Sequence, residues 1–259
     1  MSRFTTTDGL SLRYDDSGGD KPVLLLSNSL GTRLEMWDRQ MSDFKNHFRV
    51  LRYDKRGHGE SEVKVGPTSF ARLTLDAVEL LDHVGVAKAS WCGLSMGGMS
   101  GMWAATHHAD RFTKFLLCNT AASMPTASMW NDRIRVVKTE GLTKLIPSIL
   151  DRWLTKRFQA ADPKAVEWVT SMLRTTPNEG YAACSAAIRD MDQRFPIRSI
   201  KAPVMVIAGT HDGSTSAARG REIADAIEGA IFVELDAAHL SNIEQTAAFT
   251  DAALSFLTA

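Results

Sequence analysis

The chain of 259 residues lacks several features that mark whole classes of protein. Lysine plus arginine and aspartate plus glutamate each total 30, so no excess charge attracts nucleic acid or an anionic membrane. No apolar run approaches the roughly 20 residues that span a bilayer. The start, MSRFTTTDG, has no basic-then-apolar leader, so we expect no secretion signal. These absences predict a cytoplasmic protein without nucleic-acid or membrane partners.

Cysteine is also scarce. The three cysteines, Cys92, Cys118 and Cys184, are an odd number and include no Cys-x-x-Cys pair. Cys92 and Cys118 lie in apolar runs, which favours small core residues in a reducing compartment. We find no internal repeat and no low-complexity segment, and we predict no metal site.

What the chain does have is an alternation of strand-like and helical patterns. Several strand-like runs are apolar throughout, as expected of strands covered on both faces of a sheet. Helical spacing spans 67–83 and 242–257, the latter opening with the capping box Ser241-x-x-Glu244. Asp8-Gly9 predicts a hairpin and an antiparallel N-terminal edge. The six runs are PVLLLSN (22–28), FRVLRYD (48–54), KASWCGL (88–94), KFLLCNT (114–120), PVMVIAGT (203–210) and AIFVELD (230–236). The pattern predicts an α/β protein with a mostly parallel sheet and helices on both faces.

The alternation stops between about residues 122 and 195. Pro147, Asp162-Pro163 and Thr176-Pro177 punctuate four predicted helices there, and no strand pattern appears. We interpret residues 122–195 as a helical cap inserted into a core made of residues 1–121 and 196–259.

A single serine stands between glycines in the middle of the chain. Gly93-Leu94-Ser95-Met96-Gly97 matches Gly-x-Ser-x-Gly, and it follows a predicted strand and precedes a predicted helix. A serine on so sharp a turn has a strained backbone, and flanking side chains would clash. We predict that Ser95 is a nucleophile; the alternative is a serine that only caps the helix.

A serine hydroxyl needs a base and an orienting acid. His239 directly follows the last predicted strand, which places it at the same edge of the sheet as Ser95. Asp212 follows the preceding strand, so the order serine, aspartate, histidine matches that of the α/β-hydrolases. Asp190 and Asp192 are rivals by order but fall in the insertion, and Asp236 lies close to His239 along the chain. His211, next to Asp212, is interpreted as incidental.

The remaining component is a pair of backbone amides for the oxyanion. Met96 directly follows the nucleophile, and the second donor should come from the loop Asn28-Ser29-Leu30-Gly31. We predict the amides of Leu30 and Met96, with Gly31 allowing close approach; the alternative is a plain glycine-containing turn.

Several motifs together go beyond the fold. LLLSNSLGT, LRYDKRGHGES, CGLSMGG, LCNTAA, AGTHD and ELDAAHLSNIE resemble the 3-oxoadipate enol-lactonases over nearly the whole chain, including Trp130, Arg133, Arg152-Trp153 and EGY (179–181). The resemblance implies hydrolysis of a small anionic lactone to 3-oxoadipate, without a cofactor. Arg33 replaces a commonly acidic residue, and HDGSTSA lacks a common Thr-Pro; we expect both positions to border the pocket.

The residues predict acyl transfer in two steps, with Ser95 attacking the lactone carbonyl and His239 then activating water. A concerted attack by water stays open, as does the oligomeric state. Rival functions are a general carboxylesterase, a cofactor-free perhydrolase or haloperoxidase with the same triad, and a binding protein that has lost turnover. A haloalkane dehalogenase is excluded because its nucleophile is a carboxylate.

The cap is rich in positive charge. Residues 122–158 hold three acidic residues, Asp132, Glu140 and Asp151, and seven basic ones, Arg133, Arg135, Lys138, Lys144, Arg152, Lys156 and Arg157. Most are expected on a solvated helix face. Arg133 lies three residues after Trp130, so the two share a helix face. We predict that Arg133, with Arg152 as the substitute, binds the substrate carboxylate, and that Trp130 and Trp153 line the pocket.

Overall fold

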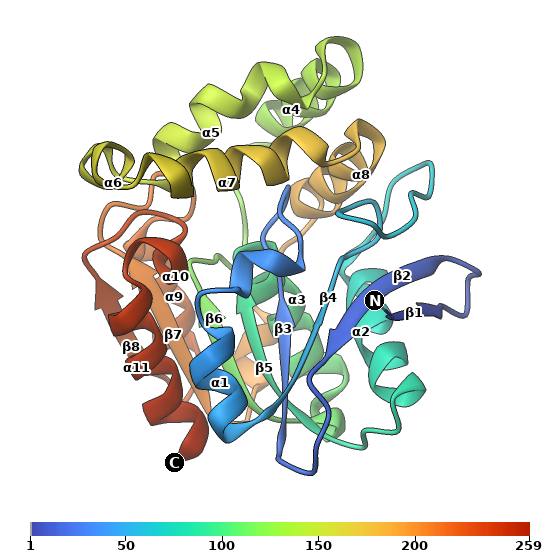
Figure 1. Cartoon of the computed structure of the whole chain (residues 1–259), viewed down its shortest axis with the longest axis vertical. Coiled ribbons are helices and arrows are strands. Elements are labelled where there is room, and N and C mark those ends of the chain that lie inside the picture. The colour runs from blue at the N-terminus through green and yellow to red at the C-terminus, as the bar shows by residue number, and fades with distance from the viewer. Residues whose placement is uncertain (1) are drawn as a thin grey trace.

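Eight strands form one sheet in the order β1-β2-β4-β3-β5-β6-β7-β8 (Figure 1). The computed structural model describes residues 2–259. The strands are β1 (Ser2–Thr5), β2 (Ser11–Asp16), β3 (Val23–Ser27), β4 (Arg49–Tyr53), β5 (Ala89–Leu94), β6 (Phe112–Cys118), β7 (Val204–Gly209) and β8 (Ile231–Leu235). Pairing is parallel from β4 to β8, whereas β2 is antiparallel to β1 and β4. The predicted α/β-hydrolase fold and its antiparallel edge are confirmed.

The N-terminal hairpin forms where Asp8-Gly9 predicts it. Gly9 has a φ of 85°, a left-handed conformation that glycine adopts without a steric cost. The amide of Thr6 donates to the carbonyl of Leu10, which closes the turn at 2.9 Å.

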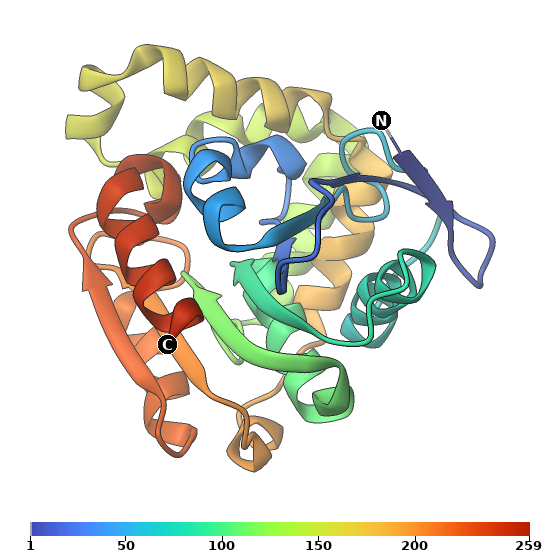
Figure 2. The ribbon, with the colours of Figure 1, turned by 60° about the horizontal axis from the view of Figure 1, so that its bottom comes forward.

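Every residue of β5 and β7 is buried, as the continuous apolar runs predict. Helices cover both faces of the sheet. Figures 1 and 2 show α1 and α11 side by side on one face. Helix α3 packs against β5 and β6 on the other face, where α2 and α9 also lie. These helices are α1 (Met41–His47), α2 (Phe70–His83), α3 (Met96–His107), α9 (Ala217–Ala226), α10 (Ser241–Glu244) and α11 (Thr246–Thr258). Strand β8 is the exposed edge, with Ile231 48% exposed. None of the helices in residues 2–259 is long and apolar enough to cross a membrane.

The segment between β6 and β7 lies across the end of the sheet where the parallel strands finish (Figure 1). It contains α4 (Ala127–Glu140), α5 (Ile146–Trp153), α6 (Lys156–Ala161), α7 (Pro163–Thr175) and α8 (Asn178–Arg189). The prediction of four helices is therefore wrong by one. Pro147, Pro163 and Pro177 each stand at the start of a helix, where a missing amide hydrogen costs nothing. Helix α6 has no such proline, and Thr155 caps it instead.

Two helix boundaries also differ from the prediction. Helix α2 begins at Phe70 rather than at 67, because the Ser69 hydroxyl accepts the amide of Arg72. The Ser241-x-x-Glu244 capping box is wrong, since Ser241 does not cap the helix through its side chain. Glu244 instead accepts the amide of Ala238 at 3.1 Å. The single C-terminal helix is divided into α10 and α11 at Gln245.

Candidate active site

Ser95 stands on the sharp turn between β5 and α3. Its φ is 56° and its ψ is −116°, a strained conformation for a residue with a side chain. The turn leaves no space for side chains on either side. A Cβ at Gly93 would lie 2.2 Å from the carbonyl oxygen of Gly97, and a Cβ at Gly97 would lie 1.9 Å from that of Ser27. Glycine is therefore required at both positions of the motif, as the sequence predicts.

The Ser95 side chain does not cap helix α3, which removes the alternative reading of the motif. The backbone of Ser95 is held from the end of β6 instead. Its amide donates to the carbonyl of Cys118 at 2.8 Å, and its carbonyl accepts the Thr120 hydroxyl at 2.8 Å. The hydroxyl of Ser95 is thus free of any helix-capping bond and lines a cavity.

Asp212 and His239 lie on the loops after β7 and β8 and are hydrogen-bonded to each other. The Nδ1 of His239 is 2.8 Å from Oδ2 of Asp212, and both residues are buried. An ionised carboxylate only accepts hydrogen bonds, so Nδ1 carries the proton and Nε2 is the free, basic nitrogen. His239 and Ser95 line the same cavity. Within residues 2–259 no hydrogen bond joins the two side chains, as is common before a substrate binds.

The carboxylate of Asp212 is surrounded by donors. Its Oδ1 accepts the amides of Ser214 and Thr215 at 2.7 and 2.8 Å, and its Oδ2 accepts the Thr215 hydroxyl at 2.9 Å. Burial acts to raise the pKa of Asp212, but the charge and hydrogen bond of His239 and these amides outweigh burial and lower it. Asp212 therefore stays ionised where His239 needs an anionic partner.

The rival carboxylates do not reach His239. Asp190 and Asp192 bind the guanidinium groups of Arg189 and Arg194 at exposed positions. Asp236 accepts from His211 at 2.9 Å and from Arg157 at the surface.

The two amides predicted for the oxyanion lie near Ser95. Met96 is the first residue of α3, so its amide is one of those that no helical carbonyl can satisfy. Leu30 lines the cavity beside Ser95. Among residues 2–259 neither amide donates to a backbone carbonyl outside the helices and strands. Gly31, with a φ of 78°, has Leu173 of the cap only 2.7 Å from where a Cβ would lie.

A cavity of about 470 Å³ lies between the carboxyl ends of the strands and the helices α4, α5 and α8. Ser95 and His239 line it from the core, and Trp130, Arg133, Arg152 and Trp153 line it from the cap segment. The Trp153 ring packs against the imidazole of His239 at 5.8 Å between centroids. Seven of the nine site residues selected from the sequence thus line one cavity. The other two adjoin lining residues, since Asp212 is hydrogen-bonded to His239 and Met96 directly follows Ser95.

The charges in the cap separate into two groups. Five of the seven basic side chains form ion pairs, namely Arg135, Lys138, Lys144, Lys156 and Arg157. Arg133 and Arg152 form none within residues 2–259. Arg133 donates to the Tyr181 hydroxyl at 2.9 Å and lies 5.4 Å from the Trp130 ring, as their spacing predicts. Burial and the positive charge of Arg133 lower the pKa of Arg152.

Some residues of the site escape sequence reasoning. Asn119 contacts Asp212, and Tyr181 holds Arg133, although both lie in motifs that carry the family resemblance. An asparagine at the carboxyl end of a parallel strand is the only local signal for the first. Conversely, Arg33 is not among the residues that line the cavity, because it pairs with Glu35 at 3.1 Å. The expectation that Arg33 borders the pocket is wrong, whereas Gly213 of the acid loop does line it.

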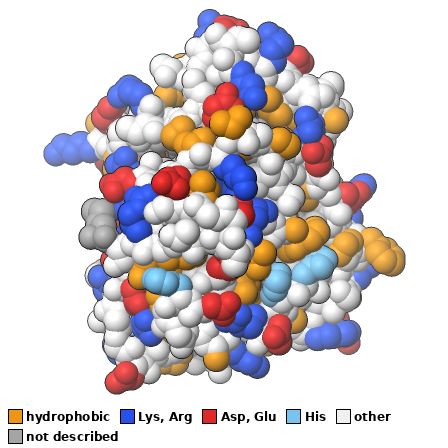
Figure 3. All heavy atoms as spheres, turned by 90° about the vertical axis from the view of Figure 1, so that its right-hand side faces the viewer, with side chains coloured by type: hydrophobic (Ala, Val, Ile, Leu, Met, Phe, Trp, Pro, Cys, Tyr) orange, Lys and Arg blue, Asp and Glu red, His pale blue; other side chains and the backbone are white. Residues whose placement is uncertain are grey.

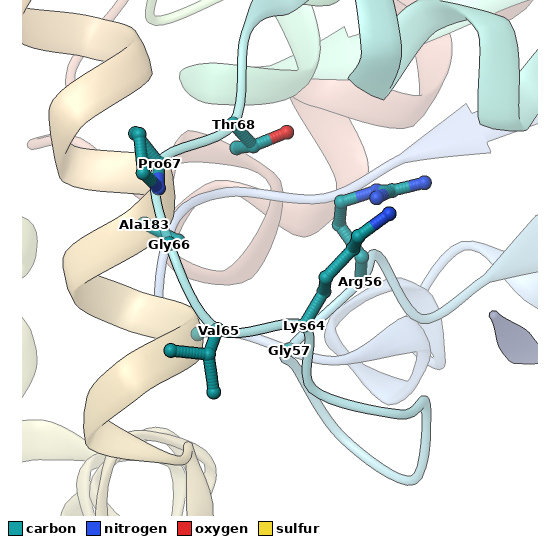
Figure 4. A pocket seen from close by; sticks show the side chains of 9 residues that line it. Arg56, Gly57, Lys64, Val65, Gly66, Pro67, Thr68 and Ala183 are labelled. Carbon is teal, nitrogen blue, oxygen red and sulfur yellow. The ribbon is translucent and has the colours of Figure 1, made fainter. Parts of the chain in front are cut away.

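A second hollow, of about 50 Å³, lies between residues 56–68 and helix α8 (Figure 4). Its two cations, Arg56 and Lys64, are both paired with Asp8, so the hollow holds no unmatched charge. No group of three or more His, Cys, Asp or Glu side chains in residues 2–259 is placed to hold a metal ion.

Comparisons with known proteins agree with this geometry. The family described as "Serine aminopeptidase, S33" matches residues 19–234. The chain is 39% identical over 248 residues to 3-oxoadipate enol-lactonase 2 of Acinetobacter baylyi, covering 95% of this chain and 93% of that protein. A crystal structure of the enol-lactonase from Burkholderia xenovorans superposes with a TM-score of 0.97, 43% identity and full coverage of both chains. A hydrolase from Pseudomonas aeruginosa has the same TM-score and 44% identity, covering 100% of this chain and 98% of the other.

Proposed function

Because the chain belongs to the 3-oxoadipate enol-lactonases within the serine-hydrolase family, we propose that it hydrolyses 3-oxoadipate enol-lactone to 3-oxoadipate. The observation that carries the proposal is one cavity that holds both the nucleophile and two arginines without acidic partners. The core supplies Ser95, Asp212 and His239 for the chemistry, and the cap (residues 122–195) supplies the groups that recognise the substrate.

Hydrolysis begins with attack on the lactone carbonyl. The Nε2 of His239 removes the proton from Ser95 Oγ as the oxygen bonds to the carbonyl carbon. The amides of Leu30 and Met96 hold the negative charge of the tetrahedral oxygen. The ring C–O bond then breaks and releases an enolate that stays attached to the acyl chain. The imidazolium supplies the proton with which the enolate becomes a ketone, so the leaving group needs little further help.

Release of the acid follows the same route with water. His239 takes a proton from water as the hydroxide adds to the acyl carbon, and the imidazolium then gives that proton to Ser95 Oγ as the bond to the acyl carbon breaks. Asp212 keeps the proton on Nδ1 throughout and stabilises the imidazolium. The short 2.8 Å bond between Asp212 and His239 is suited to this task.

Recognition of the substrate's carboxymethyl group belongs to the cap. Arg133 and Arg152 line the cavity, and neither forms an ion pair with a carboxylate within residues 2–259. Trp130 and Ser29 also line the cavity, and the buried indole Nε1 of Trp130 and hydroxyl of Ser29 have no hydrogen-bond partner within residues 2–259.

Direct assay tests the proposal. Purified protein is given freshly generated enol-lactone and, separately, p-nitrophenyl acetate. We expect a much higher kcat/KM for the lactone, and comparable values for both would favour a general esterase. Ser95→Ala should lower turnover by at least about 10³-fold, because the nucleophile is lost. Ser42→Ala, at an exposed position on α1, is the matched control and should keep full turnover.

Two outcomes separate the remaining alternatives. Turnover by Ser95→Ala within tenfold of the parent would exclude the covalent route and favour direct attack by water. A protein that binds the lactone without turnover, and whose Ser95 does not react with a fluorophosphonate, would be a binding protein.

A further inference from the structure

The end of β6 and the residues that follow it contact two of the proposed catalytic residues, Ser95 and Asp212, and the residue next to the third, His239. Cys118 accepts the amide of Ser95, and the Thr120 hydroxyl donates to the Ser95 carbonyl. Asn119, between them, reaches Asp212 and the residue before His239. Three consecutive residues therefore connect the elbow of the nucleophile with the loops of the acid and the base.

Asn119 is held rigidly in this position. It is fully buried, and its φ of 44° lies in the left-handed region, which asparagine tolerates better than most residues. Its backbone amide donates to the carbonyl of Ile207 in β7 at 2.7 Å. Its side-chain Nδ2 donates to Oδ2 of Asp212 at 3.1 Å and to the carbonyl of Ala238 at 3.2 Å. One amide group thus joins the acid to the chain immediately before His239.

The orientation of the amide is fixed by the partners on its two sides. The Ser241 hydroxyl donates to Oδ1 of Asn119 at 2.5 Å, and it is also fully buried. A carboxylate and a carbonyl on the other side can only accept, so Nδ2 must face Asp212 and Oδ1 must face Ser241. The hydrogen bonds then form one chain, from Ser241 through Asn119 to the same oxygen of Asp212 that binds His239.

We propose that Asn119, held by Ser241, is a positioning residue that fixes Asp212 Oδ2 toward His239 and joins the acid loop to the base loop. The inference rests on the proposed function only in assigning Asp212 and His239 to catalysis, and it does not depend on which ester the enzyme prefers. Neither residue lines the cavity, so neither touches the substrate.

Three variants test this role. Asn119→Gly removes the amide, and glycine accepts the left-handed backbone without strain. Loss of an orienting group should lower kcat by about 10–100-fold and leave KM within about threefold. Ser241→Ala leaves Asn119 in place but removes the donor that holds its Oδ1, so we expect a smaller loss of about 3–10-fold in kcat. Asn46→Asp, at an exposed position on α1, is the control for the charged variant below and should leave kcat unchanged.

Asn119→Asp distinguishes positioning from a merely structural role. It replaces a donor with a second carboxylate beside Asp212, where His239 is the titratable side chain that holds the Asp212 pKa down. The added negative charge should stabilise the imidazolium form relative to the neutral imidazole. The acid limb of the kcat/KM profile should therefore move to higher pH by about one unit, and the limb for Asn46→Asp should not move.

Measurements on both the lactone and p-nitrophenyl acetate separate this inference from the proposed function. The effects of Asn119 must appear equally on both substrates, because they act through the triad. If only p-nitrophenyl acetate is hydrolysed but the variants behave as described, the substrate assignment fails and the inference stands. Folded Asn119→Gly with kcat within threefold of the parent, or Asn119→Asp with an unshifted acid limb, overturns the inference. If Asn119→Gly does not fold, unchanged kcat in Ser241→Ala overturns it.

Discussion

At the scale of single residues, the candidate site contains two arginine side chains that form no ion pair within residues 2–259. Arg133 and Arg152 lie close enough to affect each other's charge, and both lack a carboxylate in residues 2–259. Two neighbouring guanidinium groups repel each other, so an anion between them relieves the repulsion. We therefore expect the pair to favour binding of an anionic ligand.

Arg133→Met tests the carboxylate contact. We expect kcat/KM on the enol-lactone to fall about 100-fold, about 3 kcal/mol, because the substrate carboxylate loses a desolvated partner. The same variant should change p-nitrophenyl acetate hydrolysis less than about threefold, since that ester is neutral. Arg135→Met on the same helix, whose cation is exposed and paired with Asp132, should affect neither substrate. Equal losses on both substrates would count against the contact.

At the scale of elements, the strand β5, the elbow and helix α3 are packed to the limit of backbone contact. Gly97 packs directly against the Ser27 carbonyl of β3, and no Cβ would fit between them. Gly98 packs as closely against the side chain of Thr120, where a Cβ would lie 2.7 Å from the Thr120 Cβ. Helix α3 is consequently buried along much of its length and lies under the oxyanion loop. Its position, and with it the Met96 amide, depends on these glycines.

Gly97→Ala should therefore disrupt both stability and turnover. Its Cβ would lie 1.9 Å from a backbone oxygen, which cannot rotate away. We expect a loss of about 3 kcal/mol in the free energy of unfolding, measured by urea denaturation, with little residual activity. Gly220→Ala in α9 is the comparison, because its Cβ would meet side chains at 3.2 Å or more. It should keep its turnover; a Gly97→Ala enzyme with parental stability would contradict the packing argument.

At the scale of the whole molecule, the cap is seated on loops of the core. Gly57 and Gly180 touch so closely that a Cβ on Gly57 would lie 2.4 Å from the Gly180 Cα. Two residues before Gly57, the ammonium of Lys55 is buried and donates to the carbonyl of Asn28, the first residue of the loop Asn28-Ser29-Leu30-Gly31. Charges of both signs are interspersed over the surface shown in Figure 3, so the buried Lys55 stands apart from the general pattern.

Lys55 makes the stability of the molecule depend on pH. Burial lowers the pKa of Lys55 from its ordinary 10.5 to about 7. Between these values the unfolded chain binds more protons than the folded one, so the free energy of unfolding rises with pH. The neighbouring His58, whose pKa burial lowers to about 4, is mostly neutral in both states over this interval. Burial raises the pKa of Cys184 from 9.0 to about 12, so above about pH 9 the unfolded thiol loses its proton first and offsets part of the gain.

Lys55→Met should remove this dependence. Relative to the parent, its free energy of unfolding should fall by ~2 kcal/mol between pH 7 and pH 9, since the parent gains stability there and the variant does not. Urea denaturation at several pH values measures the difference. Lys45→Met, an exposed lysine on α1, should follow the parent at every pH. A difference between Lys55→Met and the parent that does not change with pH would mean that Lys55 keeps an ordinary pKa.

The sequence by itself determined what depends on neighbouring residues. Local sterics and periodicity can be predicted from the sequence without a structure. They account for the glycines around Ser95, the turn at Gly9 and the apolar runs of β5 and β7. Chain order alone places Asp212 and His239 after the strands of the core. The resemblance to a known family then added predictions for residues of the cap.

The tertiary structure decided what depends on residues that are distant along the chain. Ser241 bonds to Asn119 across 122 positions instead of capping its own helix. Asn119 meets Asp212 across 93 positions only because β6 and β7 are neighbours in the sheet. Which two of seven basic side chains stay unpaired also depends on where the cap helices place the acidic ones. Strand order and packing, which no local pattern encodes, settled each of these.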